Sequence, residues 1–227
     1  MSRVQNNSDE THVYRGDNLS CWRGGRMVFE GLSFEVKAGE YLHLKGANGS
    51  GKSTLIRLLA GLLETRTGSA SFAGDSMLGS DVAASAHVIY SGHQHALKPV
   101  LTLRENSENY VKLMTGGSLA YETLEAAVDR FDLYDLIDTP VRYFSSGQTH
   151  RCSLLRFCLL DRPIWLMDEP TVGLDAENRG RLEAVMQDHL NGGGIILAAS
   201  HDPLNLGGKT LMMADFEAKA SGQEYWL

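Results

Sequence analysis

Eight consecutive residues from Gly46 to Ser53 read GANGSGKS and match the phosphate-loop pattern G-x-x-x-x-G-K-[ST] at every position. In such a loop, closely spaced backbone N–H groups surround phosphate oxygens, and glycines permit the tight curvature that this requires. Lys52 supplies a positive charge for the β- and γ-phosphates, whereas Ser53 supplies a hydroxyl ligand for Mg²⁺. An ordinary glycine-rich turn would need neither residue at these places. The pattern therefore predicts a nucleoside triphosphate site formed by Gly46, Ala47, Asn48, Gly49, Ser50, Gly51, Lys52, Ser53 and Thr54.

A second signal is a pair of acids that ends a short apolar run. The run Ile164–Met167 is typical of a buried strand, and Asp168 and Glu169 follow it directly. Asp168 can hold Mg²⁺ at the phosphates, and Glu169 can orient and deprotonate an attacking water molecule. Acids are also common in turns and helix caps. Because a phosphate loop lies upstream, we interpret Asp168 as a metal ligand and Glu169 as a catalytic base.

The elements that must position these residues are visible as hydrophobic patterns. Residues 27–36 and 41–45 have the alternation of strands, and residues 37–40 form a turn between them. After the glycine-rich loop, the sequence from Lys52 onward has leucines at helical spacing. The phosphate loop thus connects a strand to a helix, as its function requires.

The second half of the chain predicts helices followed by a βαβ unit. Thr102 and Glu105 have the spacing of a capping box, and residues 119–131 have a second helical periodicity. Strand patterns return at 164–167 and 195–200, with a helical pattern over 176–190 between them. We therefore expect residues 1–227 to form one domain of the α/β class, with a mostly parallel core sheet and a helical lobe inserted at approximately 92–160.

Composition limits the remaining functions. The chain has 227 residues and a net charge of −7, which argues against nucleic acid as a partner. Its three cysteines have no disulfide or zinc-site spacing. No apolar run approaches the ~18 residues of a membrane span, and the first nineteen residues lack the apolar stretch of a secretory signal. We expect a protein of the cytosol or of the cytosolic face of a membrane.

Taken together, these motifs resemble the nucleotide-binding domain of ABC transporters. Phe144–Gln148 is similar to the signature LSGGQ of that family, with Phe for Leu and Ser for the first Gly, and residues 171–175 resemble its D-loop. His201 resembles the switch histidine, although a lone histidine is more often a structural or surface residue. The resemblance implies a P-loop NTPase fold with an antiparallel β subdomain, ATP and Mg²⁺ as cofactors, and a catalytic His201. It also implies that a second copy of the chain completes each ATP site in a homodimer, with nucleotide contacts from Ser145, Gly147, Gln148 and Asp175.

Two positions depart from the pattern of this family. The glutamine of the Q-loop is replaced by His93, with Gln94 one residue later, and either side chain can approach the metal and the water. The aromatic residue that stacks on adenine falls at Arg23, with Trp22 adjacent. Since an arginine plane can also stack on a base, we expect weak base selectivity.

Further blocks between residues 19 and 204 resemble the ATP-binding subunit of the haem exporter of cytochrome c maturation, in which histidine at the Q-loop position is typical. They include Cys21–Arg26, Gly92–Lys98, Pro140–Arg142 and Gly192–Gly193. The resemblance implies a peripheral ATPase on the cytoplasmic face of the inner membrane, bound to integral membrane subunits of a cytochrome c maturation complex. Its hydrolysis would drive release of a haem-loaded chaperone, and haem itself would not bind this chain.

Other functions remain open at this point. An ATPase of an ABC exporter for another substrate would carry the same motifs. A non-transport ABC ATPase of DNA repair or the ribosome usually has coiled-coil insertions or two cassettes in one chain, and neither is present. A small-molecule P-loop kinase would lack the signature, and a silent regulatory cassette would lack the catalytic acids.

Overall fold

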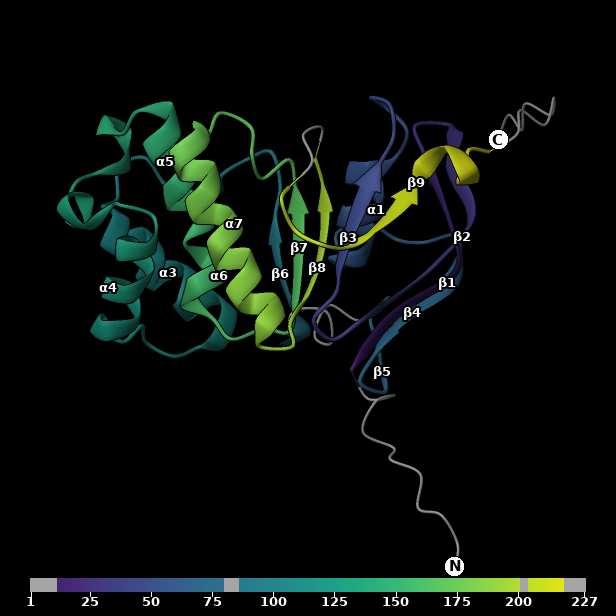
Figure 1. Cartoon of the computed structure of the whole chain (residues 1–227), viewed down its shortest axis with the longest axis horizontal. Helices are drawn as coiled ribbons and strands as arrows, with labels where there is room; N and C mark the ends of the chain where they lie inside the picture. Colours follow the sequence, from purple (N-terminus) through teal and green to yellow (C-terminus); the bar gives the residue numbers. More distant parts are fainter. Residues whose placement is uncertain (1–11, 80–85, 201–203, 219–227) are drawn as a thin grey trace, which may run out of the picture.

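A five-stranded parallel sheet forms the centre of the molecule in a computed structural model that describes residues 12–79, 86–200 and 204–218. Its strands β7 and β8 point to the upper edge in Figure 1. In spatial order the strands are β6 (Val88–Ser91), β7 (Ile164–Asp168), β8 (Ile195–Ala199), β3 (Tyr41–Lys45) and β9 (Lys209–Met212). Because all five are parallel, their carboxyl ends meet at one edge, where ligands bind in open α/β sheets.

A second, antiparallel sheet packs beside the first. It contains β2 (Arg26–Lys37), β1 (Val13–Arg23), β4 (Thr67–Phe72) and β5 (Asp75–Ser76) in that order. Gly24 and Gly25 join β1 to β2 with φ angles of 58° and 76°, a backbone conformation that favours glycine. The turn expected at 37–40 is confirmed, since the N–H of Glu40 donates to the carbonyl of Lys37 at 3.0 Å.

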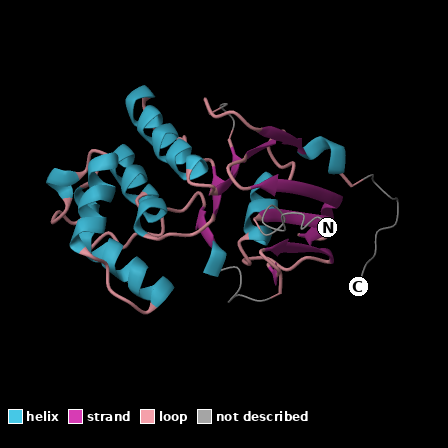
Figure 2. Ribbon diagram, turned by 60° about the horizontal axis from the view of Figure 1, so that its bottom comes forward, coloured by secondary structure: helices cyan, strands magenta, loops and turns pink. Residues whose placement is uncertain are grey.

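Helices occupy the chain between β6 and β7 and lie together at one end of the molecule, as Figure 2 shows. They are α3 (Leu103–Thr115), α4 (Tyr121–Arg130), the 3₁₀ turns Tyr134–Leu136 and Val141–Tyr143, α5 (Ser146–Leu154) and α6 (Arg156–Leu159). The capping box at the start of α3 is confirmed, because Thr102 accepts from the N–H of Glu105 and Glu105 accepts from the N–H of Thr102. The combination of a parallel sheet, an antiparallel sheet and a helical lobe is the expected fold class.

Two hydrophobic cores lie on opposite faces of the parallel sheet. Trp165 and Met167 of β7 pack against the helical lobe and α7 (Ala176–Asn191). Ile164 and Leu166 of the same strand pack on the other face with α1 (Lys52–Leu59) and the antiparallel sheet. All five residues of β7 are buried, as expected for a strand covered on both sides. This double cover fixes the position of the residues that follow β7.

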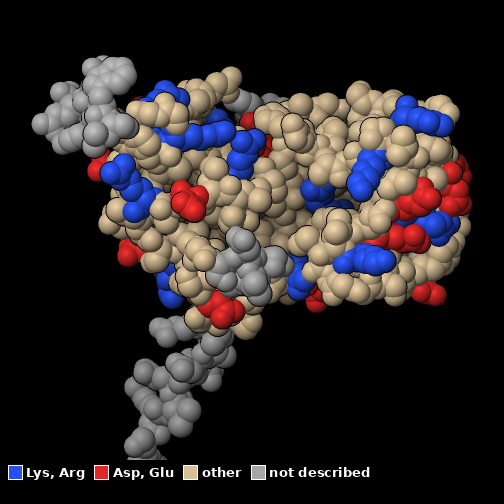
Figure 3. Space-filling view, turned by 180° about the vertical axis from the view of Figure 1, so that it is seen from behind, with Lys and Arg blue, Asp and Glu red and all other residues tan. Residues whose placement is uncertain are grey.

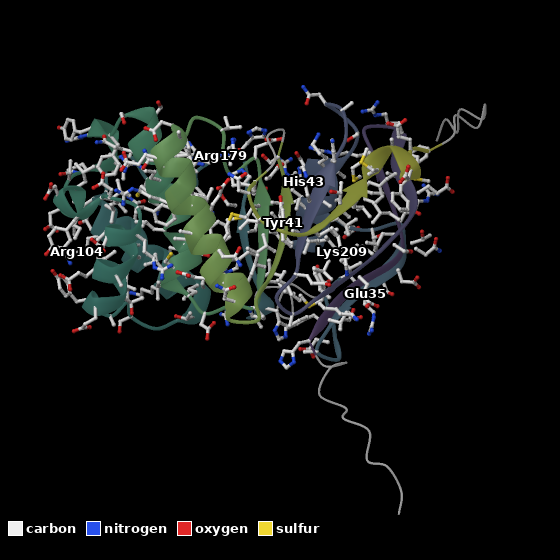
Figure 4. All side chains as sticks on the ribbon, viewed as in Figure 1. Glu35, Tyr41, His43, Arg104, Arg179 and Lys209 are labelled. Atoms are coloured by element: carbon white, nitrogen blue, oxygen red, sulfur yellow. The ribbon has the colours of Figure 1, made fainter. Side chains whose placement is uncertain are left out.

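The surface has no single charge sign on the face drawn in Figure 3, where basic and acidic side chains are intermixed at both ends of the molecule. Figure 4 labels one member of each of two ion pairs, Arg104 at the end formed by the helical lobe and Lys209 nearer the middle of the molecule. Arg104 in the helical lobe lies 2.8 Å from Asp138, and Lys209 of β9 lies 2.7 Å from Glu40. Among the described residues, no helix combines the length and apolar content needed to cross a bilayer.

Candidate functional site

The phosphate loop connects the carboxyl end of β3 to the first turn of α1. Gly51 is the N-cap of α1 and has a φ angle of 101°. A β-carbon at Gly51 would lie 2.8 Å from Cγ1 of Val28, so both the backbone conformation and the space require glycine. The N–H groups of the first turn of α1 are therefore directed at the space in front of the loop, where a phosphate is stabilised by the helix dipole.

Lys52 lies within the curve of this loop. Its ammonium donates to the carbonyls of Gly46 and Ala47 at 2.8 and 3.0 Å, and only 7% of the residue is exposed. These two bonds hold a buried positive charge with which no described acid forms an ion pair. A phosphate oxygen can accept from the third hydrogen of the ammonium group, since Lys has three donors.

Ser53 and Asp168 come together although they are 115 residues apart, because α1 begins and β7 ends at the same edge of the sheet. The hydroxyl of Ser53 donates to Oδ1 of Asp168 at 2.8 Å. Asp168 is 3% exposed, and its Oδ2 is buried with no hydrogen-bond partner among the residues that the structure describes. Because an unpaired buried carboxylate oxygen is costly, this pair fits a cation. Among the described residues, no group of three or more His, Cys, Asp or Glu could hold a metal.

Glu169 follows Asp168 and turns the chain sharply. Its φ angle is 57°, in the left-handed region that glutamate rarely adopts, and its N–H donates to the carbonyl of Ala199 at 2.8 Å. Strain of this kind persists where neighbouring structure enforces it and is concentrated at functional sites. The conformation places Glu169 on the wall of the cavity that also contains Lys52.

A cavity of about 670 Å³ lies in front of the phosphate loop. Its lining residues are Arg23, Gly24, Arg26, Val28, Asn48, Gly49, Gly51, Lys52, Ser53, Thr54, His93, Glu169 and Val172. A smaller cavity of about 230 Å³ shares three of these residues and reaches the helical lobe. It is lined by Gly92, His93, His95, Ser146, His150, Asp168, Glu169, Val172 and Gly173. Phosphate loop, carboxylates and helical lobe thus border one continuous region.

At each of the two positions that depart from the family pattern, one of the alternative residues lines a cavity and the other does not. Arg23 lines the large cavity, whereas Trp22 does not and lies instead under the guanidinium of Arg66 at 5.5 Å. His93 lines both cavities, and Gln94 lines neither. Arg26 also lines the large cavity and was missed by the sequence analysis. The Gly24–Gly25 turn contained the signal, because a two-residue hairpin pairs Arg23 with Arg26 across the strands.

Ser146 of the signature and Val172 and Gly173 of the D-loop line the cavities, but the four residues that the resemblance assigns to nucleotide contacts line neither of them. Ser145 is the N-cap of α5 and forms a capping box with Gln148, and Gly147 lies in the first turn of that helix. Asp175 caps α7, where its carboxylate accepts from the N–H of Asn178 at 2.9 Å and thereby keeps the pKa of Asp175 low. Ser145, Gly147, Gln148 and Asp175 therefore do not contact the phosphate loop of their own chain.

The predicted switch histidine, His201, lies outside the described residues. The residue before it is anchored by β3, since Nε2 of His43 donates to the carbonyl of Ser200 at 2.9 Å. His43 is labelled near the centre of the sheet in Figure 4. The hydroxyl of Ser200 also lies 3.2 Å from that of Thr171. The carboxyl end of β8 is thus held against the loop that carries Glu169.

Comparison with known proteins gives a consistent match. The family described as ABC transporter matches residues 29–172. A cytochrome c biogenesis ATP-binding export protein CcmA of Rhodopseudomonas palustris is 42% identical over 196 residues, which cover 86% of this chain and 95% of that protein. A protein of the same name from Nitrobacter winogradskyi is 43% identical over 86% of this chain and 95% of its own length.

Solved structures match the fold as well. A putative ABC transporter ATP-binding protein from Pyrococcus furiosus aligns with a TM-score of 0.79 at 17% identity and covers 91% of this chain and 100% of that chain. A dimeric ATP-binding cassette in a post-hydrolysis state with ADP and Pi aligns with a TM-score of 0.73 at 20% identity and covers 83% of this chain and 88% of that chain.

Proposed function

Because the chain belongs to the ABC transporter family and is an ATP-hydrolysing domain, we propose that its hydrolysis serves an export step of cytochrome c maturation. The observation that carries this proposal is 42% identity along 95% of a protein named for that process. The position of His93 on the wall of both cavities supports it, since histidine in place of the Q-loop glutamine is typical of those subunits.

In the proposed mechanism, the phosphate loop and the start of α1 bind the triphosphate, and Lys52 neutralises its terminal charge. Ser53 and Asp168 would hold Mg²⁺, which would stabilise the charge that develops on the phosphates. The carboxylate of Glu169 takes a proton from the attacking water, and the Ala199 carbonyl holds the backbone of this residue in position. Arg23, which lines the same cavity as Arg26, would stack on the base, and His93, which lines it together with Glu169, would approach the metal and the water.

We also propose that the active form is a dimer in which each chain completes the site of the other. Ser145, Gly147, Gln148 and Asp175 lie away from the phosphate loop of their own chain, and a similar cassette has been solved as a dimer with ADP and Pi. Hydrolysis would then open and close the dimer, and membrane subunits would convert this motion into release of a haem-loaded chaperone. His201 would contact the γ-phosphate.

The membrane subunits are proposed to dock on the helical lobe beside residues 97–106, at the cytoplasmic face of the inner membrane. Val100 and Tyr143 are both strongly exposed there, and their segments lie together because the N–H of Arg142 donates to the carbonyl of Pro99 at 2.8 Å. Exposed apolar side chains on neighbouring loops are typical of an interaction site. We expect no haem to bind this chain.

The test is replacement of the gene in a strain that matures c-type cytochromes. Cells that contain only Glu169→Gln should lose haem-stained c-type cytochromes and accumulate haem-loaded chaperone, whereas the wild-type chain should restore both. Normal cytochromes with Glu169→Gln would contradict the proposed role. Copurification from detergent-solubilised membranes supplies the second measurement. A set of partners without cytochrome c maturation proteins would leave the ATPase intact and indicate an exporter of another substrate.

A further inference from the structure

The loop that carries Glu169 is held from both sides by different parts of the molecule. On one side, the N–H of Glu169 donates to the carbonyl of Ala199 in β8 at 2.8 Å. On the other side, the carbonyl of Pro170 accepts from Nε2 of His150 at 2.8 Å. His150 belongs to α5 of the helical lobe, 20 residues away in sequence. The residue with the strained backbone therefore lies between two fixed points.

These two hydrogen bonds determine the backbone torsions of Glu169. Between the two bonded groups, rotation is possible only about φ and ψ of Glu169 and about the backbone of Pro170. The ring of Pro170 fixes its own φ near −65°. With both ends held, little freedom remains for Glu169 to leave its φ of 57° and relax to an ordinary conformation. The bond from His150 is therefore a reason why the strained conformation persists.

His150 is itself well positioned for this bond. Its ring meets the ring of His95 edge to face, with centroids 5.1 Å apart and planes at 88°. Burial lowers the pKa of His150 and the nearby His95 lowers it as well, whereas the hydrogen bond to Pro170 raises it; the net shift is downward and favours the neutral ring. A carbonyl only accepts hydrogen bonds, so the single ring hydrogen lies on Nε2.

The backbone of His95, the ring neighbour of His150, is also held in place by hydrogen bonds. Arg156 of α6 donates to the backbone carbonyls of His95 and Tyr90, the second at 3.1 Å. The guanidinium is covered by the ring of Tyr110, 5.6 Å from its centroid. Contacts thus run without a break from Arg156 of α6 through His95 and His150 to Pro170, the residue after Glu169.

We propose that His150 is a positioning residue for hydrolysis, which holds the carbonyl of Pro170 and thereby keeps the carboxylate of Glu169 directed into the nucleotide cavity. The proposal rests on the proposed role of Glu169 as the base. It adds that the position of α5 controls the orientation of Glu169 within one chain, without a contribution from a second copy.

The experiment compares three variants of the full chain by phosphate release and by nucleotide binding. His150→Leu removes the donor but keeps a side chain of similar volume. We expect kcat to fall about tenfold, which is part of the roughly 10²–10⁴-fold rate acceleration that a positioned base supplies. The Kd for nucleotide should not change. His150→Gln carries an amide N–H that can replace Nε2–H, and it should restore most of kcat. The matched control is His189→Phe, which removes another half-buried histidine, at the C-terminal end of α7, and should leave kcat unchanged.

A double-mutant cycle separates positioning from general stability. Once Glu169→Gln has removed the base, His150→Leu should cause no further loss in single-turnover hydrolysis. An equal tenfold loss in both backgrounds, or a His150→Gln variant as slow as His150→Leu, would overturn the proposal while leaving Glu169 as the base. Full activity of Glu169→Gln would instead overturn the proposed site and this inference together. If His150→Leu does not fold, His150→Asn, whose amide is too short to reach Pro170, replaces it in the same comparison.

Discussion

Lys52 is the residue on whose charge the phosphate site depends most directly. Replacement by Ala removes the ammonium group that donates to the carbonyls of Gly46 and Ala47, although the Ala47 carbonyl still accepts from the N–H of Ser50. We expect ATPase activity to fall at least about 100-fold in Lys52→Ala, because the charge that stabilises the transferred phosphoryl group is lost. Phosphate release and fluorescent-nucleotide binding measure the effect. Lys112→Ala on α3 is the control, and an equal loss in both variants would show that Lys52 has no specific role.

Asp168 should set the dependence of hydrolysis on Mg²⁺. In Asp168→Asn the side chain can still accept from Ser53 but has lost the negative charge of its buried Oδ2. We expect the half-saturating Mg²⁺ concentration to rise at least about tenfold, because a hard cation prefers carboxylate oxygen. Chelation of Mg²⁺ should stop the wild-type enzyme reversibly. A Mg²⁺ titration identical to that of the wild type would contradict the assignment.

Single residues could be predicted from the sequence where the chemistry lies in one continuous stretch. Gly46–Ser53 and Asp168–Glu169 were found in this way. The contact of His150 with Pro170 could not be found, because it depends on how the helical lobe packs on the sheet. The left-handed conformation of Glu169 could not be predicted from the sequence either, since nothing in the residue type indicates it.

At the scale of elements, the capping box of α3 gives a direct stability prediction. Thr102→Ala removes the acceptor of the Glu105 N–H and should lower the free energy of unfolding by about 1 kcal/mol. Urea unfolding of the full chain measures this change. Asn109→Ala, at an exposed position in the middle of α3, is the control because it leaves the capping box intact. Equal losses in both variants would argue against a capping effect.

His189, near the C-terminal end of α7, should make the stability of the fold depend on pH. His189 stacks on Trp165, with ring centroids 3.8 Å apart, and burial lowers its pKa from 6.5 to about 4. The folded state thus resists protonation of His189, so its contribution is complete above about pH 6.5 and is lost as the pH falls toward 4. His189→Phe retains an aromatic ring without the titration. Between pH 7 and about pH 5 this variant should therefore lose less stability to urea than the wild type, and an unchanged pH profile would contradict the prediction.

Elements were predictable where their periodicity is regular. The helices after Lys52, Thr102 and Asp175 and the strands at 41–45, 164–167 and 195–200 appear close to the expected places. β1 was not expected, and its pairing with β2 shows why. The register shifts between Gly16 and Leu19 and twice more before Arg23, and Asn18 has a φ of 50°. These bulges break the alternation on which recognition of a strand depends.

At the scale of the whole molecule, ATP should bring two copies together. Glu169→Gln traps the bound state because nucleotide can bind but hydrolysis is slow. We expect this variant to be dimeric with ATP and Mg²⁺ and monomeric with ADP in light scattering, with its membrane partners present. Adding Ser145→Arg, which places a large cation at the cap of α5, should prevent the dimer. A monomer under all conditions would contradict the proposed completion of each site by a second chain.

The strained backbone of Glu169 also has a consequence for how this protein can evolve or be engineered. A left-handed glutamate costs roughly 1–2 kcal/mol that glycine or asparagine would not. Glu169→Gly should therefore melt at a higher temperature than the wild type although it cannot hydrolyse ATP. Selection for heat resistance alone would replace this residue early, so thermostable variants of this chain must be screened for turnover at the same time.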